Sequence, residues 1–303
     1  MSEDLIAVDL PASVTRATGE GGLPVLRSST AVATGEVYLH GAHVSAYTPA
    51  GQDPVIWMSK ASMFAAGQPI RGGVPICFPW FGAGREPGMA PAHGFARLAD
   101  WTLVGADDTD GVVALTFRLT EADLGRLPGV EAWPHGFELT YAVTFGPELT
   151  LALSVSNTSG EEYSFEEALH TYFHVKDITA VTVEGLDGAS YLDKAPGAGA
   201  DRPTQSGPVD FTGETDRVYA VTGTAVAVDP GSARAITVVK KNSANTVVWN
   251  PWTAKAAAMA DYDDAEWPTM LCVETANALE HAITLGAGQS HTMTTRISVA
   301  PRV

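Results

Sequence analysis

The segment FELTYAVTFGPELTLALSV, residues 137–155, decides the fold class of this chain. Every second residue from Phe137 to Phe145 is apolar, and the same alternation runs from Leu149 to Val155. Because successive side chains of a strand point to opposite faces, this period of two indicates two half-buried strands. The intervening Gly146-Pro147-Glu148 is typical of a turn. The segment therefore predicts a long antiparallel hairpin with one apolar face.

Short strand patterns separated by turn residues fill the rest of the chain. Further strands are predicted at residues 37–39, 44–47, 55–58, 113–119, 180–183, 225–228, 236–239, 246–249, 270–274 and 292–299. Helical patterns are short, and the candidates are one turn starting at Ser59, residues 121–127 and residues 255–259. We therefore predict an all-β protein, a large antiparallel β-sandwich with a few short helical turns. It would be one domain over residues 1–303, with residues 1–22 as an N-terminal arm or edge strand.

Composition and charge restrict the partners of this chain. It has 303 residues, 45% of them hydrophobic, and a formal net charge of -17 at pH 7. No cluster of Lys and Arg is present, so neither nucleic acid nor a membrane is expected as a partner. The N-terminus lacks the features of a signal peptide, and no apolar stretch is long enough to span a bilayer. We expect a cytoplasmic monomer in which Cys77 and Cys272 are free thiols.

The stretch QPIRGGVPICFPWFG, residues 68–82, combines three prolines, three glycines, three aromatic residues and Arg71. Proline fixes φ and glycine allows close approach, so the stretch predicts a rigid, shaped loop. It would either wall a small-molecule pocket with one charge or form an apolar core segment with Arg71 at its solvent edge. The same choice, sugar stacking or core, is open for four aromatic residues: Phe78, Trp80, Trp249 and Trp252.

His170 and His174 are four residues apart, which is a metal-ligand spacing on a helix. On a strand, positions four apart are separated by roughly 13 Å, too far to share one ion. The surrounding Thr, Tyr, Phe and Val favour a strand, so a metal site is the minor alternative.

Glu274 ends the apolar segment MLCVE, residues 270–274, on the same face as Met270 and Cys272. Its carboxylate would lie either at the wet end of a strand or in a desolvated position. Desolvation raises the pKa of a carboxyl group and makes it a usable base near neutral pH.

A group of acidic residues follows the last helical pattern: Asp261, Asp263, Asp264 and Glu266. It lacks the glycine and the correctly spaced final Glu of a calcium-binding loop, so a solvated loop is expected. The motifs of nucleotide-binding loops, serine hydrolases and zinc proteases are absent from the sequence.

Seven short motifs occur in order along the chain: PIRGGVP (69–75), FPWFG (78–82), HGFAR (93–97), HTYF (170–173), ETD (214–216), VVWNPW (247–252) and CVE (272–274). Together they resemble the glucose-6-phosphate 1-epimerase (hexose-6-phosphate mutarotase) family, within the aldose 1-epimerase, galactose-mutarotase-like superfamily. The fold of that family is a large antiparallel β-sandwich, in agreement with the strand pattern. The resemblance implies a catalytic pair, His170 and Glu274. It also implies four substrate-binding residues, of which the arginines would hold a phosphate: Arg71, His93, Arg97 and Asp216.

The implied reaction is the interconversion of α and β anomers of a hexose 6-phosphate, glucose 6-phosphate in the first place. Glu274 would take the proton of the anomeric hydroxyl while His170 protonates the ring oxygen, with no cofactor and no metal. Where relatives carry a Gln before the His-Gly pair, this chain has Ala92, so one substrate hydrogen bond is expected to be lost. The alternatives are a non-catalytic carbohydrate-binding sandwich or sugar sensor, and a metal-dependent isomerase using His170 and His174.

Overall fold

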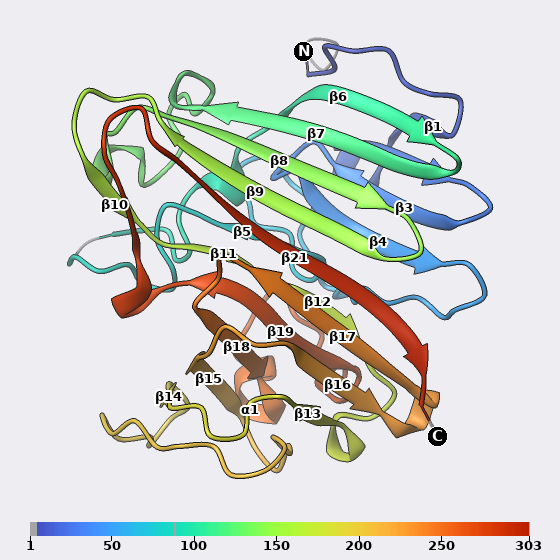
Figure 1. Cartoon of the computed structure of the whole chain (residues 1–303), viewed down its shortest axis with the longest axis vertical. Coiled ribbons are helices and arrows are strands. Elements are labelled where there is room, and N and C mark those ends of the chain that lie inside the picture. Colours follow the sequence, from blue (N-terminus) through green and yellow to red (C-terminus); the bar gives the residue numbers. More distant parts are fainter. Residues whose placement is uncertain (1–4, 88, 303) are drawn as a thin grey trace.

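The computed structural model describes residues 5–87 and 89–302, and most regular elements in them are β-strands in antiparallel sheets (Figure 1). The largest sheet has eight strands in the order β13-β16-β17-β21-β9-β8-β7-β6. Its strands are β6 (Thr102–Thr109), β7 (Val112–Thr120), β8 (Phe137–Phe145), β9 (Leu149–Asn157), β13 (Thr182–Glu184), β16 (Ala225–Asp229), β17 (Arg234–Lys241) and β21 (Ser290–Pro301).

The hairpin predicted from the deciding segment is confirmed as β8 and β9. Phe137 pairs with Asn157 and Phe145 pairs with Leu149. In both strands every second residue is buried. The apolar face therefore packs inward, and the Thr and Ser positions between are less buried.

A seven-stranded sheet lies beside the eight-stranded one and carries most of the residues discussed below (Figure 1). Its path is β14-β15-β18-β19-β11-β5, with β12 also paired to β19. The strands are β5 (Ile76–Cys77), β11 (Glu167–Leu169), β12 (Tyr172–His174), β14 (Tyr191–Asp193), β15 (Thr215–Ala220), β18 (Asn245–Asn250) and β19 (Met270–Asn277). Every residue of β18 and β19 is buried, so both faces of these central strands are covered.

A four-stranded sheet, β1-β2-β3-β4, packs against the end of the β8–β9 hairpin. A Cβ atom on Gly35 would lie 2.3 Å from the ring of Phe145, so only glycine permits this approach. Tyr47 stacks on the same ring and donates its hydroxyl hydrogen bond to the Gly146 carbonyl, at 3.0 Å. β1 forms the edge of this sheet, and β10 pairs with β20 in a separate two-stranded sheet. These six strands are β1 (Val14–Thr18), β2 (Pro24–Ser29), β3 (Ala33–Tyr38), β4 (His43–Pro49), β10 (Tyr163–Phe165) and β20 (Ile283–Leu285).

Helical structure is confined to short segments, as the sequence predicts. The one α-helix in the described part of the chain is α1 (Trp252–Ala257). The 3-10 helices are η1 (Glu20–Gly22), η2 (Ala96–Leu98), η3 (Glu121–Asp123), η4 (Val130–Ala132), η5 (Ile178–Ala180), η6 (Pro230–Ser232), η7 (Trp267–Thr269) and η8 (Leu279–His281). None of the helices in residues 5–87 and 89–302 is long and apolar enough to cross a membrane.

Two local predictions are wrong. The helical turn expected after Ser59 does not form; the chain makes a short non-helical turn there, and the Ser59 hydroxyl accepts hydrogen bonds from the amide of Ala61 and from that of the distant Asp263. The expected strand at residues 55–58 is reduced to two isolated bridges, Ile56 with Phe173 and Met58 with Gly72. In both cases a contact distant in sequence replaces the regular local element.

Candidate active site

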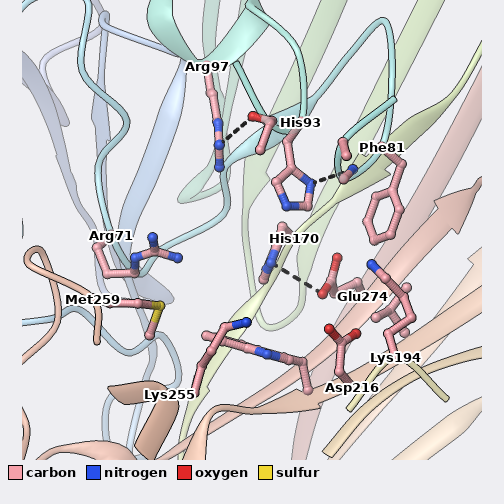
Figure 2. Close-up of a pocket in the computed structure, with 15 residues that line it drawn as sticks. Arg71, Phe81, His93, Arg97, His170, Lys194, Asp216, Lys255, Met259 and Glu274 are labelled. Atoms are coloured by element: carbon pink, nitrogen blue, oxygen red, sulfur yellow. Dashed lines mark hydrogen bonds and ion pairs between the residues drawn. The ribbon is translucent and has the colours of Figure 1, made fainter. Parts of the chain in front are cut away.

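A cavity of about 300 Å³ opens over one face of β15, β18 and β19 (Figure 2). The register of these strands explains what lines it. Trp249 pairs with both Asp216 and Cys272, and Val247 pairs with Glu274. Because alternate residues share a face, three neighbouring strands present Asp216, Trp249 and Glu274 to the same side. All six residues that the sequence singled out as site residues line this cavity: Arg71, His93, Arg97, His170, Asp216 and Glu274.

His170 and Glu274 face each other at the centre of the cavity. The Nε2 atom of His170 lies 3.4 Å from Oε1 of Glu274, and their side chains are 9% and 1% exposed. His170 interrupts the path between β11 and β12, where its amide donates to the Pro75 carbonyl at 3.0 Å. Its ring stacks on Tyr172 with 4.8 Å between centroids and 10° between planes. Glu274 therefore occupies a desolvated position, the second of the two that its sequence context allows.

Burial shifts both members of the pair toward their uncharged forms. It raises the pKa of Glu274 well above its ordinary value, and nearby Asp216 adds to the rise. It lowers the pKa of His170 well below its ordinary value, helped by the charges of Arg71 and Arg97. Between those two pKa values the pair holds a single proton. One group can then accept a proton while the other donates one, as paired acid and base chemistry requires.

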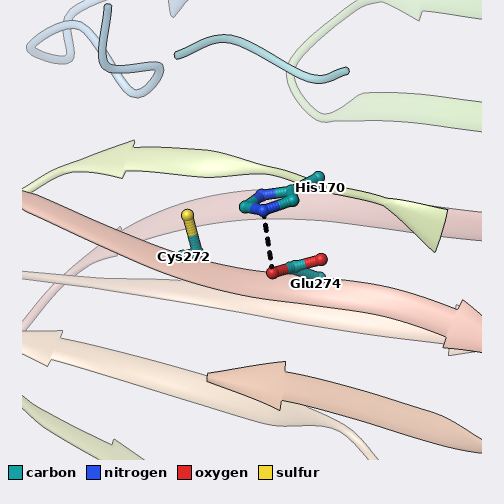
Figure 3. A group of neighbouring side chains, drawn as sticks. All are labelled: His170, Cys272 and Glu274. Carbon is teal, nitrogen blue, oxygen red and sulfur yellow. Dashed lines mark ion pairs between the residues drawn. The ribbon is translucent and has the colours of Figure 1, made fainter. Parts of the chain in front are cut away.

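Cys272 completes a compact group with this pair (Figure 3). One nitrogen of His170, the Cys272 Sγ and one Glu274 oxygen lie within 4.8 Å of one another. Burial raises the pKa of the Cys272 thiol well above its ordinary value. Cys272 packs among Trp57, Tyr172, Trp249 and other apolar neighbours. We therefore interpret His170 and Glu274 as a proton-transfer pair and Cys272 as a core residue packed beside it.

The alternative metal pair is not brought together. His174 is exposed at the end of β12 and does not line the cavity, whereas His170 faces into it. The segment follows strand geometry, so positions four apart are separated as the strand interpretation expects. Cys77 and Cys272 are confirmed as free thiols, and both are buried.

Arg71 enters the cavity from a loop and Arg97 from η2, and both lie on one side of the central pair (Figure 2). Arg71 donates from Nε to Asp261 at 3.1 Å and from Nη1 to the Tyr172 hydroxyl at 3.0 Å. Arg97 donates from Nη2 to the Ala92 carbonyl at 2.7 Å. Its buried Nε has no hydrogen-bond partner among the residues described. Both guanidinium groups are thus positioned by the protein, and Arg97 keeps donor capacity for a ligand.

One expectation about the acidic loop is wrong. Asp261 is not solvated, since it is 8% exposed and forms an ion pair with Arg71 at 3.0 Å. Glu266 is equally buried and accepts a hydrogen bond from the Lys60 amide. Asp263 and Asp264 are more exposed, as expected. The partner of Asp261 is 190 residues away in sequence, so no local pattern indicates this pairing.

Two lysines line the cavity that the sequence interpretation missed. Lys194 follows β14, where its amide donates to the Asp216 carbonyl at 2.7 Å and its Nζ lies 5.1 Å from the Phe81 ring centroid. Lys255 comes from α1, with Nζ 4.0 Å from a Glu214 oxygen. With the two arginines, they give this cavity four cations against two carboxylates, in a chain of net charge -17. Asp261 and Glu214 partly offset Arg71 and Lys255, but the lining itself is richer in cations than in carboxylates and offers donors to an anion.

The four aromatic candidates divide between core and cavity. Phe78 and Trp80 belong to the main hydrophobic core and are at most 1% exposed. Trp249 lines the cavity, and Trp252 packs on Trp267 with 4.3 Å between ring centroids. Phe81, which the sequence interpretation did not single out, adds a second aromatic wall. The stretch 68–82 therefore serves both functions, with a core side and a cavity side.

Comparisons with known proteins agree with this arrangement. The sequence profile of a family described as Aldose 1-epimerase matches residues 26–298. A protein of Escherichia coli (strain K12), provisionally named a glucose-6-phosphate 1-epimerase, is 41% identical over 244 residues, covering 80% of this chain and 79% of that protein. A protein of Cenchrus ciliaris with the same provisional name is 36% identical over 283 residues, covering 88% of this chain and 81% of that protein. The crystal structure of a provisionally assigned mutarotase from Salmonella typhimurium matches with a TM-score of 0.87 at 32% identity, covering 97% of this chain and 96% of that one. The predicted antiparallel sandwich is thereby confirmed.

Proposed function

Because this chain belongs to the aldose 1-epimerase family, we propose that it interconverts the α and β anomers of a hexose 6-phosphate, glucose 6-phosphate in the first place. The chain is an isomerase of the epimerase type. The observation that carries the substrate proposal is the buried His170–Glu274 pair in a cavity that also holds four cations. The non-catalytic carbohydrate-binding alternative is not favoured, since the relatives carry epimerase names.

The reaction needs two coupled proton movements. We propose that Glu274 removes the proton of the anomeric hydroxyl while His170 protonates the ring oxygen. The ring opens to an aldehyde, the C1–C2 bond rotates, and closure on the other face reverses both transfers. The protons return to the pair, so the overall reaction consumes none and requires no cofactor. Burial places the single proton of the resting pair on Glu274, so the reactive form arises when that proton passes to His170 across the 3.4 Å contact. Arg97 and Lys194 oppose the effect of burial by lowering the pKa of Glu274.

The two arginines are the proposed phosphate-binding groups, and Asp216 the group that binds sugar hydroxyls. A guanidinium fork pairs with two phosphate oxygens at once, which suits a dianionic ester. Asp216 and Lys194 lie on the other side of the catalytic pair from Arg71 and Arg97 (Figure 2). A hexose phosphate bound between these two sides would place its anomeric carbon near His170 and Glu274.

A comparison of substrates and arginine variants tests the phosphate proposal. We expect Arg71→Ala and Arg97→Ala each to raise the KM for glucose 6-phosphate roughly 10- to 100-fold, the usual effect of losing a charge-assisted hydrogen bond. Exchange of free glucose should change little in the same variants. Anomer exchange is measured by NMR magnetisation transfer, with Arg118→Ala, an exposed arginine of β7, as control. Equal losses for both sugars would contradict a phosphate-binding role, and no acceleration of any aldose tested would end the proposed function.

Removing either member of the catalytic pair tests the roles of the two residues. We expect His170→Asn and Glu274→Gln each to lower kcat by about 10²–10⁴, the usual contribution of a positioned acid or base. Both substitutions preserve size and hydrogen-bonding capacity, so the melting temperature should stay close to that of the parent protein. Full activity of either variant would remove that residue from the mechanism. Sugar affinity that persists in Glu274→Gln would show that binding and catalysis are separable.

A further inference from the structure

His93 is held in a backbone conformation that side chains rarely adopt. Its φ is 65°, in the left-handed region, and the next residue, Gly94, is left-handed too. The His93 amide donates to the Gly82 carbonyl at 2.7 Å, and its carbonyl accepts from the Phe78 amide at 3.2 Å. Such strain persists only where the surroundings fix it, and it is concentrated at functional sites. The strained backbone therefore fixes where the His93 ring lies.

The Nδ1 atom of His93 has two neighbours that decide its protonation. The Gly82 amide donates to Nδ1 at 3.3 Å, and the Sγ atom of Cys77 lies 3.2 Å from the same nitrogen. A backbone amide is a donor only, so Nδ1 accepts in this contact, but at 3.3 Å the contact is weak and does not fix the tautomer by itself. The contact between Nδ1 and the Cys77 Sγ atom is then a hydrogen bond only if Cys77 donates through its S–H group. Cys77 is completely buried, and burial raises the pKa of its thiol, so the S–H group stays protonated.

The Gly82 amide and the Cys77 thiol together place the proton of a neutral His93 on Nε2. The structure shows this nitrogen on the cavity side of the ring, turned toward His170 (Figure 2), with 5.5 Å between the two ring centroids. The Phe81 ring contacts the His93 ring edge-on, at 5.0 Å between centroids, and restricts rotation of the His93 ring. Burial and the charge of Arg97 lower the pKa of His93, which agrees with a neutral ring.

We propose that Cys77 is a positioning residue that, together with the Gly82 amide, holds His93 as the Nε2–H tautomer and aims an uncharged donor into the cavity. The tautomer matters because its alternative would present a lone pair to the sugar oxygens. A neutral imidazole that donates from Nε2 stabilises a developing oxygen charge without releasing its proton. His93 thus differs from His170, which exchanges its proton. The role of His93 in stabilising charge on a sugar oxygen rests on the proposed function, whereas the tautomer of His93 does not.

The tautomer can be observed directly in the substrate-free protein. In long-range ¹H–¹⁵N correlation spectra a protonated and an unprotonated ring nitrogen resonate far apart, and His93→Gln identifies the His93 signals among those of eight histidines. We expect the parent protein at neutral pH to show His93 protonated on Nε2 alone. A ring protonated on Nδ1, or on both nitrogens, would overturn the proposal whatever the enzyme does to sugars.

Two substitutions at Cys77 separate donation from packing. Cys77→Ser keeps a donor, whereas Cys77→Ala removes it and leaves only the Gly82 amide. We expect Cys77→Ala to shift the Nδ1 resonance toward the protonated form and to lower kcat about 3- to 10-fold, the usual factor for one hydrogen bond. Cys77→Ser should restore both readouts. A lowered melting temperature in Cys77→Ala with unchanged His93 resonances and unchanged kcat would reduce Cys77 to a packing residue and refute its positioning role.

Discussion

Burial gives Glu274 and His170 properties that their side chains do not have in water. Each is almost inaccessible, and the pKa of the carboxyl rises while that of the imidazole falls. A charge is costly in this buried environment, so the pair retains one proton across the 3.4 Å contact between His170 Nε2 and Glu274 Oε1. A carboxylate at the exposed end of a strand would remain ionised and would be a weaker base.

The lowered pKa of His170 has a consequence for the pH dependence. The pair binds its second proton, and becomes inactive, only when the pH falls through the His170 pKa. We therefore expect the acid limb of kcat against pH to lie below 6.5, the ordinary value for a histidine. Because a phosphate monoester itself titrates near pH 6, the profile should also be recorded with free glucose. An acid limb at or above pH 6.5 with both sugars would contradict the assignment.

At the scale of elements, one carboxylate adds a side-chain connection to the stretch 68–82, whose strand β5 already pairs with β11. Glu166, just before β11, accepts from the Phe81 amide at 2.9 Å and from the Leu279 amide at 2.6 Å. It is 1% exposed, so no solvent can replace these bonds. One side chain therefore ties the loop that bears Phe81 to the segment that follows β19. The position of that cavity wall depends on this connection.

Removing Glu166 should destabilise the fold measurably. Glu166→Ala leaves the amides of buried Phe81 and of partly exposed Leu279 without their acceptor, so we expect the free energy of unfolding to fall by about 2–4 kcal/mol. Urea denaturation followed by tryptophan fluorescence measures the change. Glu162→Ala, at an exposed carboxylate nearby, is the control and should change stability by less than about 0.5 kcal/mol. A small effect in Glu166→Ala would mean that water reaches these amides.

At the scale of the whole molecule, one apolar core connects the sheets. It extends from Val14 of β1 to Ile297 of β21 and includes residues of the eight-stranded, seven-stranded and four-stranded sheets. β21 lies inside the largest sheet, between β17 and β9, although it is the last strand in sequence. No sheet can bury its apolar face without its neighbours. We therefore propose that residues 1–303 form a single domain.

A single domain should unfold in one cooperative step. We expect far-UV circular dichroism and tryptophan fluorescence to give coincident transitions, and the calorimetric and van't Hoff enthalpies to agree. Native-state hydrogen exchange provides a sharper comparison. The slowest amides of β9 and β19, from the two large sheets, should open with the same free energy. Two resolved transitions, or clearly different free energies for these strands, would contradict the proposal.

The sequence by itself determined the antiparallel fold class and the β8–β9 hairpin, because the alternation of β8 and β9 is a local property of neighbouring residues. Its ordered motifs also singled out the six residues that meet in the cavity. Only the tertiary structure decided the environment of each side chain. Lys194 carried no prediction and Asp261 was expected to be solvated, yet Lys194 lines the cavity and Asp261 is buried against Arg71. Desolvation, partners and tautomers depend on groups that approach from elsewhere in the chain, and no local pattern encodes them.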